Sequence, residues 1–122
     1  LKTMNIDLKE ILSGFLKPYI KDGIKSSQAL LVVGTDANGL EHPNWRENLK
    51  YALRIQQKMN EKYPGLARPL HLRKERFNGH ACPGEMIIEV GSNGNTAEES
   101  RIAAKYIADC IADVISEIPE NR

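Results

Sequence analysis

The sequence predicts an α/β fold with a mostly parallel central sheet flanked by helices. The continuous apolar run Ala29–Val33 is typical of a strand covered on both faces, and the run Met86–Val90, which carries one carboxylate, also indicates a buried strand. Helical periodicity before, between and after these runs is the order expected when helices connect parallel strands. A chain of 122 residues is long enough to bury one core, so we expect a single domain over residues 1–122.

Composition argues against two classes of partner. Lys and Arg number 17 and Asp and Glu number 16, so a net charge of +1 gives no field that favours nucleic acid or an acidic membrane surface. No apolar run approaches the roughly 20 residues that span a bilayer, so no transmembrane segment is expected. No signal peptide is evident, and the chain starts at Leu1 rather than Met, which is compatible with a piece of a longer protein.

The first predicted element is a helix over residues 7–22. Gly23 is expected to end it, and Pro18, which lacks an amide hydrogen, is expected to kink or shorten it. We expect this helix to serve in packing. Its apolar positions at helical spacing are Leu8, Ile11, Leu12, Phe15, Leu16, Tyr19 and Ile20.

A polar loop and a second helix follow the Ala29–Val33 strand. Asn44 with Glu47 three residues later has the pattern of a capping box, which predicts a helix from about Trp45 to Lys62. The side chains expected to face inward are Trp45, Leu49, Ala52, Leu53 and Met59.

The remaining elements are two strands and a third helix. Leu66–Leu72 is a weak strand interrupted by Pro69, so it is expected at a sheet edge. After the strand 86–90, Thr96 begins a helix with Glu99 as its capping partner, and Pro119 ends it. The inner face expected for this helix is Ile102, Ala103, Tyr106, Ile107, Cys110, Ile111, Val114, Ile115 and Ile118.

The two cysteines are too few for a disulfide framework. Cys110 falls on the inner face of the last helix and is expected in the core. Cys82 precedes Pro83 in a loop and is expected to be exposed. His80 and Cys82 have a spacing that is compatible with metal binding but does not diagnose it.

Glu89 lies inside an apolar run, where an ionised carboxylate without a partner is costly. Three explanations are open. Glu89 pairs with a metal or another cation, it lies in a cleft at the open end of the strand, or it points to solvent from a half-exposed strand.

The position of the site depends on strand direction. If the strands 29–33 and 86–90 are parallel, the loops 35–42 and 89–95 share one sheet edge, where ligand clefts of α/β sheets lie. His42 and Glu89 would then face the same pocket. The alternative for His42 is a packing role before the Asn44 cap. The glycine-rich loop before the last helix could also bind an anion, although it is not a nucleotide-binding loop.

The order and spacing of these motifs resemble the C-terminal part of the stage II sporulation protein P family, which belongs to the zinc-dependent N-acetylmuramoyl-L-alanine amidases. The resemblance covers about residues 28–118, and residues 1–27 have no convincing counterpart. The matching segments are Val32–Thr35, His42–Trp45, Glu47–Leu49, Ala52, Tyr63–Leu66, Arg68–Pro69, Arg76–Asn78, Pro83–Gly84, Ile88–Gly91, Gly94–Thr96 and Glu98–Glu99.

The resemblance implies a peptidoglycan hydrolase with an amidase-like three-layer sandwich, present whole or only as its C-terminal portion. Such an enzyme cleaves the amide bond between N-acetylmuramic acid and L-alanine of the stem peptide. Glu89 is then the catalytic carboxylate next to a zinc-bound water. Arg68, Asn78 and Asn95 are the implied substrate-binding residues.

The resemblance also implies zinc as the cofactor. His42 is the candidate metal ligand. Further ligands are not evident in this chain, because the zinc ligands of the family lie upstream of the matching region. Location in the cell envelope, outside the cytoplasmic membrane, a role in sporulation and an envelope protein partner are implied in the same way.

Two other functions compete with hydrolysis. The chain could be a catalytically inactive amidase-like module that binds cell-wall glycan or a partner protein. It could also be an unrelated α/β binding module in which Glu89 forms a structural salt bridge. Zinc content separates the first function from the others, and a Glu89→Gln variant separates a catalytic carboxylate from a structural one.

Overall fold

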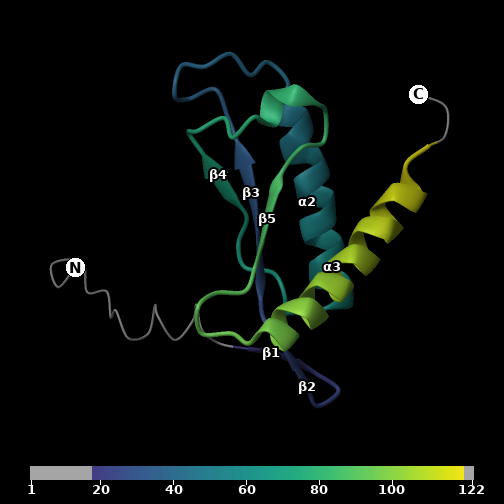
Figure 1. Cartoon of the computed structure of the whole chain (residues 1–122). Helices are drawn as coiled ribbons and strands as arrows, with labels where there is room; N and C mark the ends of the chain where they lie inside the picture. Colours follow the sequence, from purple (N-terminus) through teal and green to yellow (C-terminus); the bar gives the residue numbers. More distant parts are fainter. Residues whose placement is uncertain (1–17, 120–122) are drawn as a thin grey trace, which may run out of the picture.

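The computed structural model describes residues 18–119 as a hairpin, a three-stranded sheet and two helices (Figure 1). The elements are β1 (Tyr19–Lys21), β2 (Ile24–Ser26), β3 (Ala29–Gly34), α2 (Trp45–Lys62), β4 (His71–Arg73), a 3₁₀ turn (Gly79–Ala81), β5 (Ile87–Val90) and α3 (Ala97–Glu117).

The predicted α/β class is confirmed, but the mostly parallel sheet is wrong. The strand order is β4-β3-β5, with β3 parallel to β4 and antiparallel to β5. The helix α2 connects β3 to β4 and allows those two strands to run in the same direction. Between β4 and β5 the only helical element is the short 3₁₀ turn, and the chain returns along the other side of β3 in the opposite direction.

Both helices cover the same face of the sheet. Side chains of α2 and α3 join those of β3 in one apolar cluster, and Figure 1 shows the two helices on one side of the strands. The described part of the chain therefore has two layers, and it does not show the three-layer sandwich that the resemblance implies. We call the side of the sheet away from α2 and α3 its outer face.

The helix predicted over residues 7–22 is wrong where the structure can test it. Residues 7–17 lie outside the described part of the chain. Residues 19–21 form β1, which pairs antiparallel with β2. Asp22 (φ 53°) and Gly23 (φ 76°) make the connection, and two consecutive positive φ angles are typical of a type I′ hairpin turn. An Asp-Gly pair is a strong hairpin signal, and it outweighs the prediction that Gly23 ends a helix.

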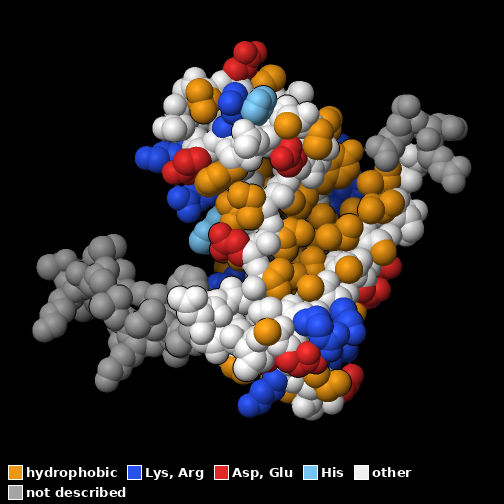
Figure 2. Space-filling model, viewed as in Figure 1, with side chains coloured by type: hydrophobic (Ala, Val, Ile, Leu, Met, Phe, Trp, Pro, Cys, Tyr) orange, Lys and Arg blue, Asp and Glu red, His pale blue; other side chains and the backbone are white. Residues whose placement is uncertain are grey.

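The helices diverge beside β5 and leave an apolar cavity of about 480 Å³. Figure 2 shows the apolar side chains gathered between β5 and α3. The cavity is lined by Tyr51, Ile55, Pro83, Gly84, Met86, Ile111, Val114, Ile115 and Ile118.

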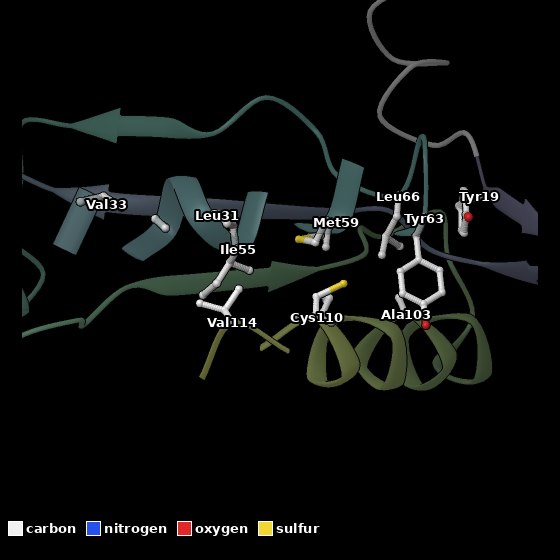
Figure 3. Close-up of a cluster of buried hydrophobic side chains, with 13 residues drawn as sticks. Tyr19, Leu31, Val33, Ile55, Met59, Tyr63, Leu66, Ala103, Cys110 and Val114 are labelled. Atoms are coloured by element: carbon white, nitrogen blue, oxygen red, sulfur yellow. The ribbon is translucent and has the colours of Figure 1, made fainter. Parts of the chain in front are cut away.

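The core lies between the sheet and the two helices (Figure 3). On α2 the buried stripe is Asn48, Ala52, Ile55 and Met59, at the spacing of one helix face. Leu53 lies outside this stripe and is 51% exposed, so its predicted inward position is wrong.

On α3 the expected inner face is largely confirmed. Ala103, Ile107, Cys110 and Val114 are buried. Ile115 is 63% exposed, so its inward assignment is wrong. Burial raises the pKa of the Cys110 thiol to about 11, which keeps it protonated and inert. Cys82 is exposed, as expected.

The helix α2 is tied to α3 by a group of polar contacts at its carboxyl end. The Lys62 ammonium lies 2.6 Å from Asp109 and 2.7 Å from Asp113. The Tyr63 hydroxyl donates a hydrogen bond to Asp109 at 2.7 Å. Burial, followed by that hydrogen bond, raises the pKa of Tyr63 to about 12. The contacts link the carboxyl end of α2 to the carboxyl half of α3.

Of the two predicted capping boxes, only that of α3 is present. The Thr96 hydroxyl accepts from the Glu99 amide at 3.1 Å, and the Glu99 carboxylate accepts from the Thr96 amide at 2.9 Å. Asn44 makes no side-chain cap bond, because its backbone (φ −104°, ψ 19°) is outside the extended region that capping requires.

We predict that Thr96→Ala lowers the free energy of unfolding by about 1 kcal/mol, because it removes a cap hydrogen bond. The matched variant Asn44→Ala should lower the free energy of unfolding by less than half as much, because it removes no such bond. Urea denaturation of the two variants measures the difference. Equal destabilisation would contradict the assignment of a cap to Thr96 alone.

Candidate functional site

Glu89 lies on the outer face of the sheet. It pairs with Leu30 in the register of β3 and β5, and directly paired residues project from the same face. The neighbouring Leu31 belongs to the core cluster, so Leu30 and Glu89 point away from it. The expectation that this strand is buried on both faces is wrong, because Ile87 and Glu89 are exposed.

Glu89 contributes to an open cavity of about 310 Å³ on this face. The structure therefore combines two of the three explanations for this carboxylate, a cleft and an exposed strand face. We call this cavity the Glu89 pocket. It is lined by Gln28, Ala29, Leu30, Arg68, Glu89, Gly91, Ser92, Asn93 and Asn95.

Arg68 reaches the same pocket from the opposite side of β3. Ala67 forms a parallel bridge with Ala29 and packs on the core, so the next residue projects to the outer face. The Arg68 amide donates to the Ala29 carbonyl at 2.8 Å, and the Arg68 carbonyl accepts from Gln56 Nε2 at 3.0 Å. The backbone of Arg68 is thus fixed from both sides.

The loop 91–95 forms the third wall. The Asn95 side-chain oxygen accepts from the Ser92 amide at 3.0 Å, and the Asn95 amide donates to the Ser92 carbonyl at 3.0 Å. Gly91 has a φ of 79°, and a Cβ there would lie 2.6 Å from Ser100 Oγ. Only glycine allows this close approach of the loop to α3. Asn95 thus shapes the wall of the pocket as well as lining it.

His42 does not share a pocket with Glu89, contrary to the arrangement expected from parallel strands. Val90 pairs with Ala29 at the start of β3, whereas the loop containing His42 leaves the other end of β3 after Gly34. Five residues of strand separate these ends by about 17 Å. The correction follows from the antiparallel direction of β5.

The structure places His42 under the 3₁₀ turn as a buried side chain. His42 is 1% exposed, and neither ring nitrogen has a hydrogen-bond partner among the described residues. Burial lowers the pKa of His42, and the neighbouring His80 and Arg76 lower this pKa further. The carboxylates of Asp36 and Glu85 raise it by a smaller amount. This environment agrees with the packing alternative for His42.

The described residues alone do not fit a zinc site. The rings of His42 and His80 are 6.5 Å apart between centroids. Within residues 18–119, no group of three or more His, Cys, Asp or Glu side chains could hold a metal ion. A zinc site requires at least three protein ligands. Zinc stays a prediction from the resemblance, and the ligand role of His42 stays a prediction from its position in the sequence.

Asn78 also lies at the His42 end and apart from Glu89. It is exposed, has a left-handed backbone (φ 59°) and precedes the 3₁₀ turn. The structure therefore brings Glu89, Arg68 and Asn95 together and leaves Asn78 and His42 outside the pocket.

Asn48 is a structural residue to which the sequence analysis assigned no role. It is 1% exposed on the inner face of α2. Asn48 Nδ2 donates to the Gly79 carbonyl at 2.9 Å, and Asn48 Oδ1 accepts from the Gly84 amide at 2.8 Å. These bonds tie both ends of the loop 79–84 to α2. A polar residue in the inward stripe of a helix was the available signal.

Three further residues near Glu89 were not assigned to the site. Gln28 and Leu30 line the pocket, and His71 projects to the same outer face because it pairs with Val32. His71 is exposed. Only the strand register shows that these residues share a face with Glu89.

No helix in residues 18–119 is long and apolar enough to cross a membrane.

We predict that acid destabilises the protein through His42. Its folded pKa lies below the ordinary value of 6.5. The neutral ring therefore contributes stability above pH 6.5, and this contribution is lost as the pH falls through the folded pKa. The free energy of unfolding should fall from pH 7 to pH 5.

The control compares His42→Gln with His71→Gln in denaturant titrations at both pH values. The first variant should show a weaker dependence on pH, and the second should match the unaltered protein because His71 is exposed. An unchanged pH dependence in His42→Gln would contradict the assignment.

Comparison with known protein families shows a match. The model of the stage II sporulation protein P (SpoIIP) family matches residues 20–112, which is more than half of the chain. The matched range contains Glu89, Arg68, Asn95, Asn78 and His42. No curated protein and no solved structure matches the chain.

Proposed function

The chain belongs to the stage II sporulation protein P family, and on this premise we propose that it acts in peptidoglycan hydrolysis connected with sporulation, with Glu89 as the catalytic carboxylate. The observation that carries the proposal is the position of Glu89. It is an exposed carboxylate that lines a pocket on the outer face, opposite Arg68 and beside Asn95.

The proposed reaction is hydrolysis of the amide bond between the lactyl group of N-acetylmuramic acid and L-alanine. Water adds to the amide carbonyl carbon, and the carbon–nitrogen bond breaks. Glu89 takes a proton from the attacking water and passes it to the leaving nitrogen. The products are a lactyl carboxylate and the free amino group of L-alanine.

Substrate positioning is assigned to Arg68 and Asn95, because both line the pocket with Glu89. The resemblance also assigns Asn78 to substrate, and its position at the other end of β3 gives that role no geometric support. Zinc is implied only by the resemblance, and no step above depends on it. Location in the cell envelope and an envelope protein partner are proposed on the same ground.

A second candidate function is binding of cell-wall material without hydrolysis. It is favoured by the charged and amide side chains of the open Glu89 pocket, which can bind a polar ligand without any metal. In this case Glu89 and Arg68 would contribute to affinity only.

We predict that Glu89→Gln lowers amidase activity at least about 100-fold, because proton transfer by a positioned side chain contributes that much or more. The melting temperature should change by no more than about 2 °C, because exposed side chains contribute little to stability. The assay measures new L-alanine amino termini released from peptidoglycan by the whole gene product, supplied with zinc.

The matched control is Glu47→Gln, an exposed glutamate in the first turn of α2, near the His42 end of the sheet. It should retain full activity. Activity that survives in Glu89→Gln would remove Glu89 from the mechanism. The second candidate function would be favoured by a different result. In that case the unaltered protein binds peptidoglycan but does not hydrolyse it, and the Glu89→Gln variant no longer binds.

A further inference from the structure

The Glu89 pocket has a charge of each sign on its two sides. Glu89 projects from β5, Arg68 projects from the chain on the far side of β3, and Leu30 lies between them. Each step between neighbouring strands is about 4.8 Å, so their Cα atoms are about 10 Å apart across the sheet. A ligand bound at Glu89 therefore reaches Arg68 only if it extends across β3.

Arg68 is held in a fixed position for such a ligand. Its amide and carbonyl groups are bonded to β3 and α2, and Pro69 restricts the backbone that follows. Its side chain is half-buried. A guanidinium group on a fixed backbone is the protein group best suited to bind a carboxylate with two parallel hydrogen bonds.

The proposed substrate carries a carboxylate two residues beyond the bond that is cut. In the stem peptide, the second residue is a D-glutamate that is linked through its side chain, so its α-carboxylate can be free. Two extended residues span about 7 Å. Such a segment is therefore long enough to extend from Glu89 across β3 towards Arg68.

Resting on the proposed function, we propose that the Glu89 pocket recognises the peptide part of its substrate and that Arg68 binds the α-carboxylate of the second stem residue. Arg68 is thereby a specificity-determining residue. The preferred substrate class is a muropeptide in which this group is a carboxylate rather than a carboxamide.

The test uses two N-acetylmuramoyl tripeptides that differ only in this group, one with the carboxylate and one with the carboxamide. Affinity is measured by NMR titration of the Glu89→Gln protein, so the measurement does not require hydrolysis. We expect the carboxylate ligand to bind about tenfold more tightly, which is typical of a hydrogen bond to a charged group.

Three variants in the same background complete the test. Arg68→Met should remove the tenfold preference, and Arg68→Lys should restore part of it because the positive charge is kept. Arg73→Met is the matched control, because Arg73 pairs with Gly34 on the same face at the far end of β4 and should leave the preference unchanged.

The proposal is overturned if the Glu89→Gln protein with an unaltered Arg68 binds the two ligands with equal affinity, whatever the variants show. Binding of neither ligand overturns it as well. These outcomes differ from failure of the proposed function, which would appear as amidase activity that survives Glu89→Gln. A merely structural Arg68 would lower the melting temperature in Arg68→Met and leave the ratio between the ligands unchanged.

Discussion

The register between β3 and β5 is the constraint on which the site depends. It pairs Leu30 with Glu89, and a slip of one residue would turn the carboxylate into the core. Backbone bonds just outside the strands hold this register. The Gly91 amide donates to the Gln28 carbonyl at 2.9 Å, and the Ser27 amide donates to the Glu99 carbonyl at 3.1 Å. The start of α3 is therefore fixed against the same end of β3 that carries the pocket.

In the two-layer arrangement, one face of the sheet forms the core and the other face carries the candidate site. The helices bury one face, where Leu31, Met59 and Cys110 pack together. The outer face carries Glu89, which is exposed, and Arg68, which is half-buried. Because both side chains project from backbone that is hydrogen-bonded to β3, their separation is set by the sheet and not by loop flexibility. In the proposed function, this fixed separation would position an extended peptide against Glu89.

The other end of β3 is organised by buried polar groups. Asn48 ties the loop 79–84 to α2, and the buried neutral ring of His42 lies beneath Gly79. A Cβ on Gly34 would lie 2.5 Å from the carbonyl oxygens of Glu75 and Arg76, so this strand end is closed by backbone. The sequence motif around His42 thus contributes packing near the 3₁₀ turn, while the pocket that contains Glu89 forms at the opposite edge.

The sequence by itself determined the α/β class, the extent of α2, the Thr96 cap of α3 and the buried Cys110, because each depends on local periodicity or a short motif. It also singled out Glu89, since a carboxylate in an apolar run is costly to bury. Only the tertiary structure decided the direction of β5, the hairpin at Asp22-Gly23 and the partners of Glu89. An apolar run has no direction, and the residues that face one another across β3 are set by pairing between segments distant in the chain. For that reason the strand pattern predicted a pocket shared with His42, whereas the pocket in the structure contains Arg68 and Asn95, which only the resemblance had placed at the site.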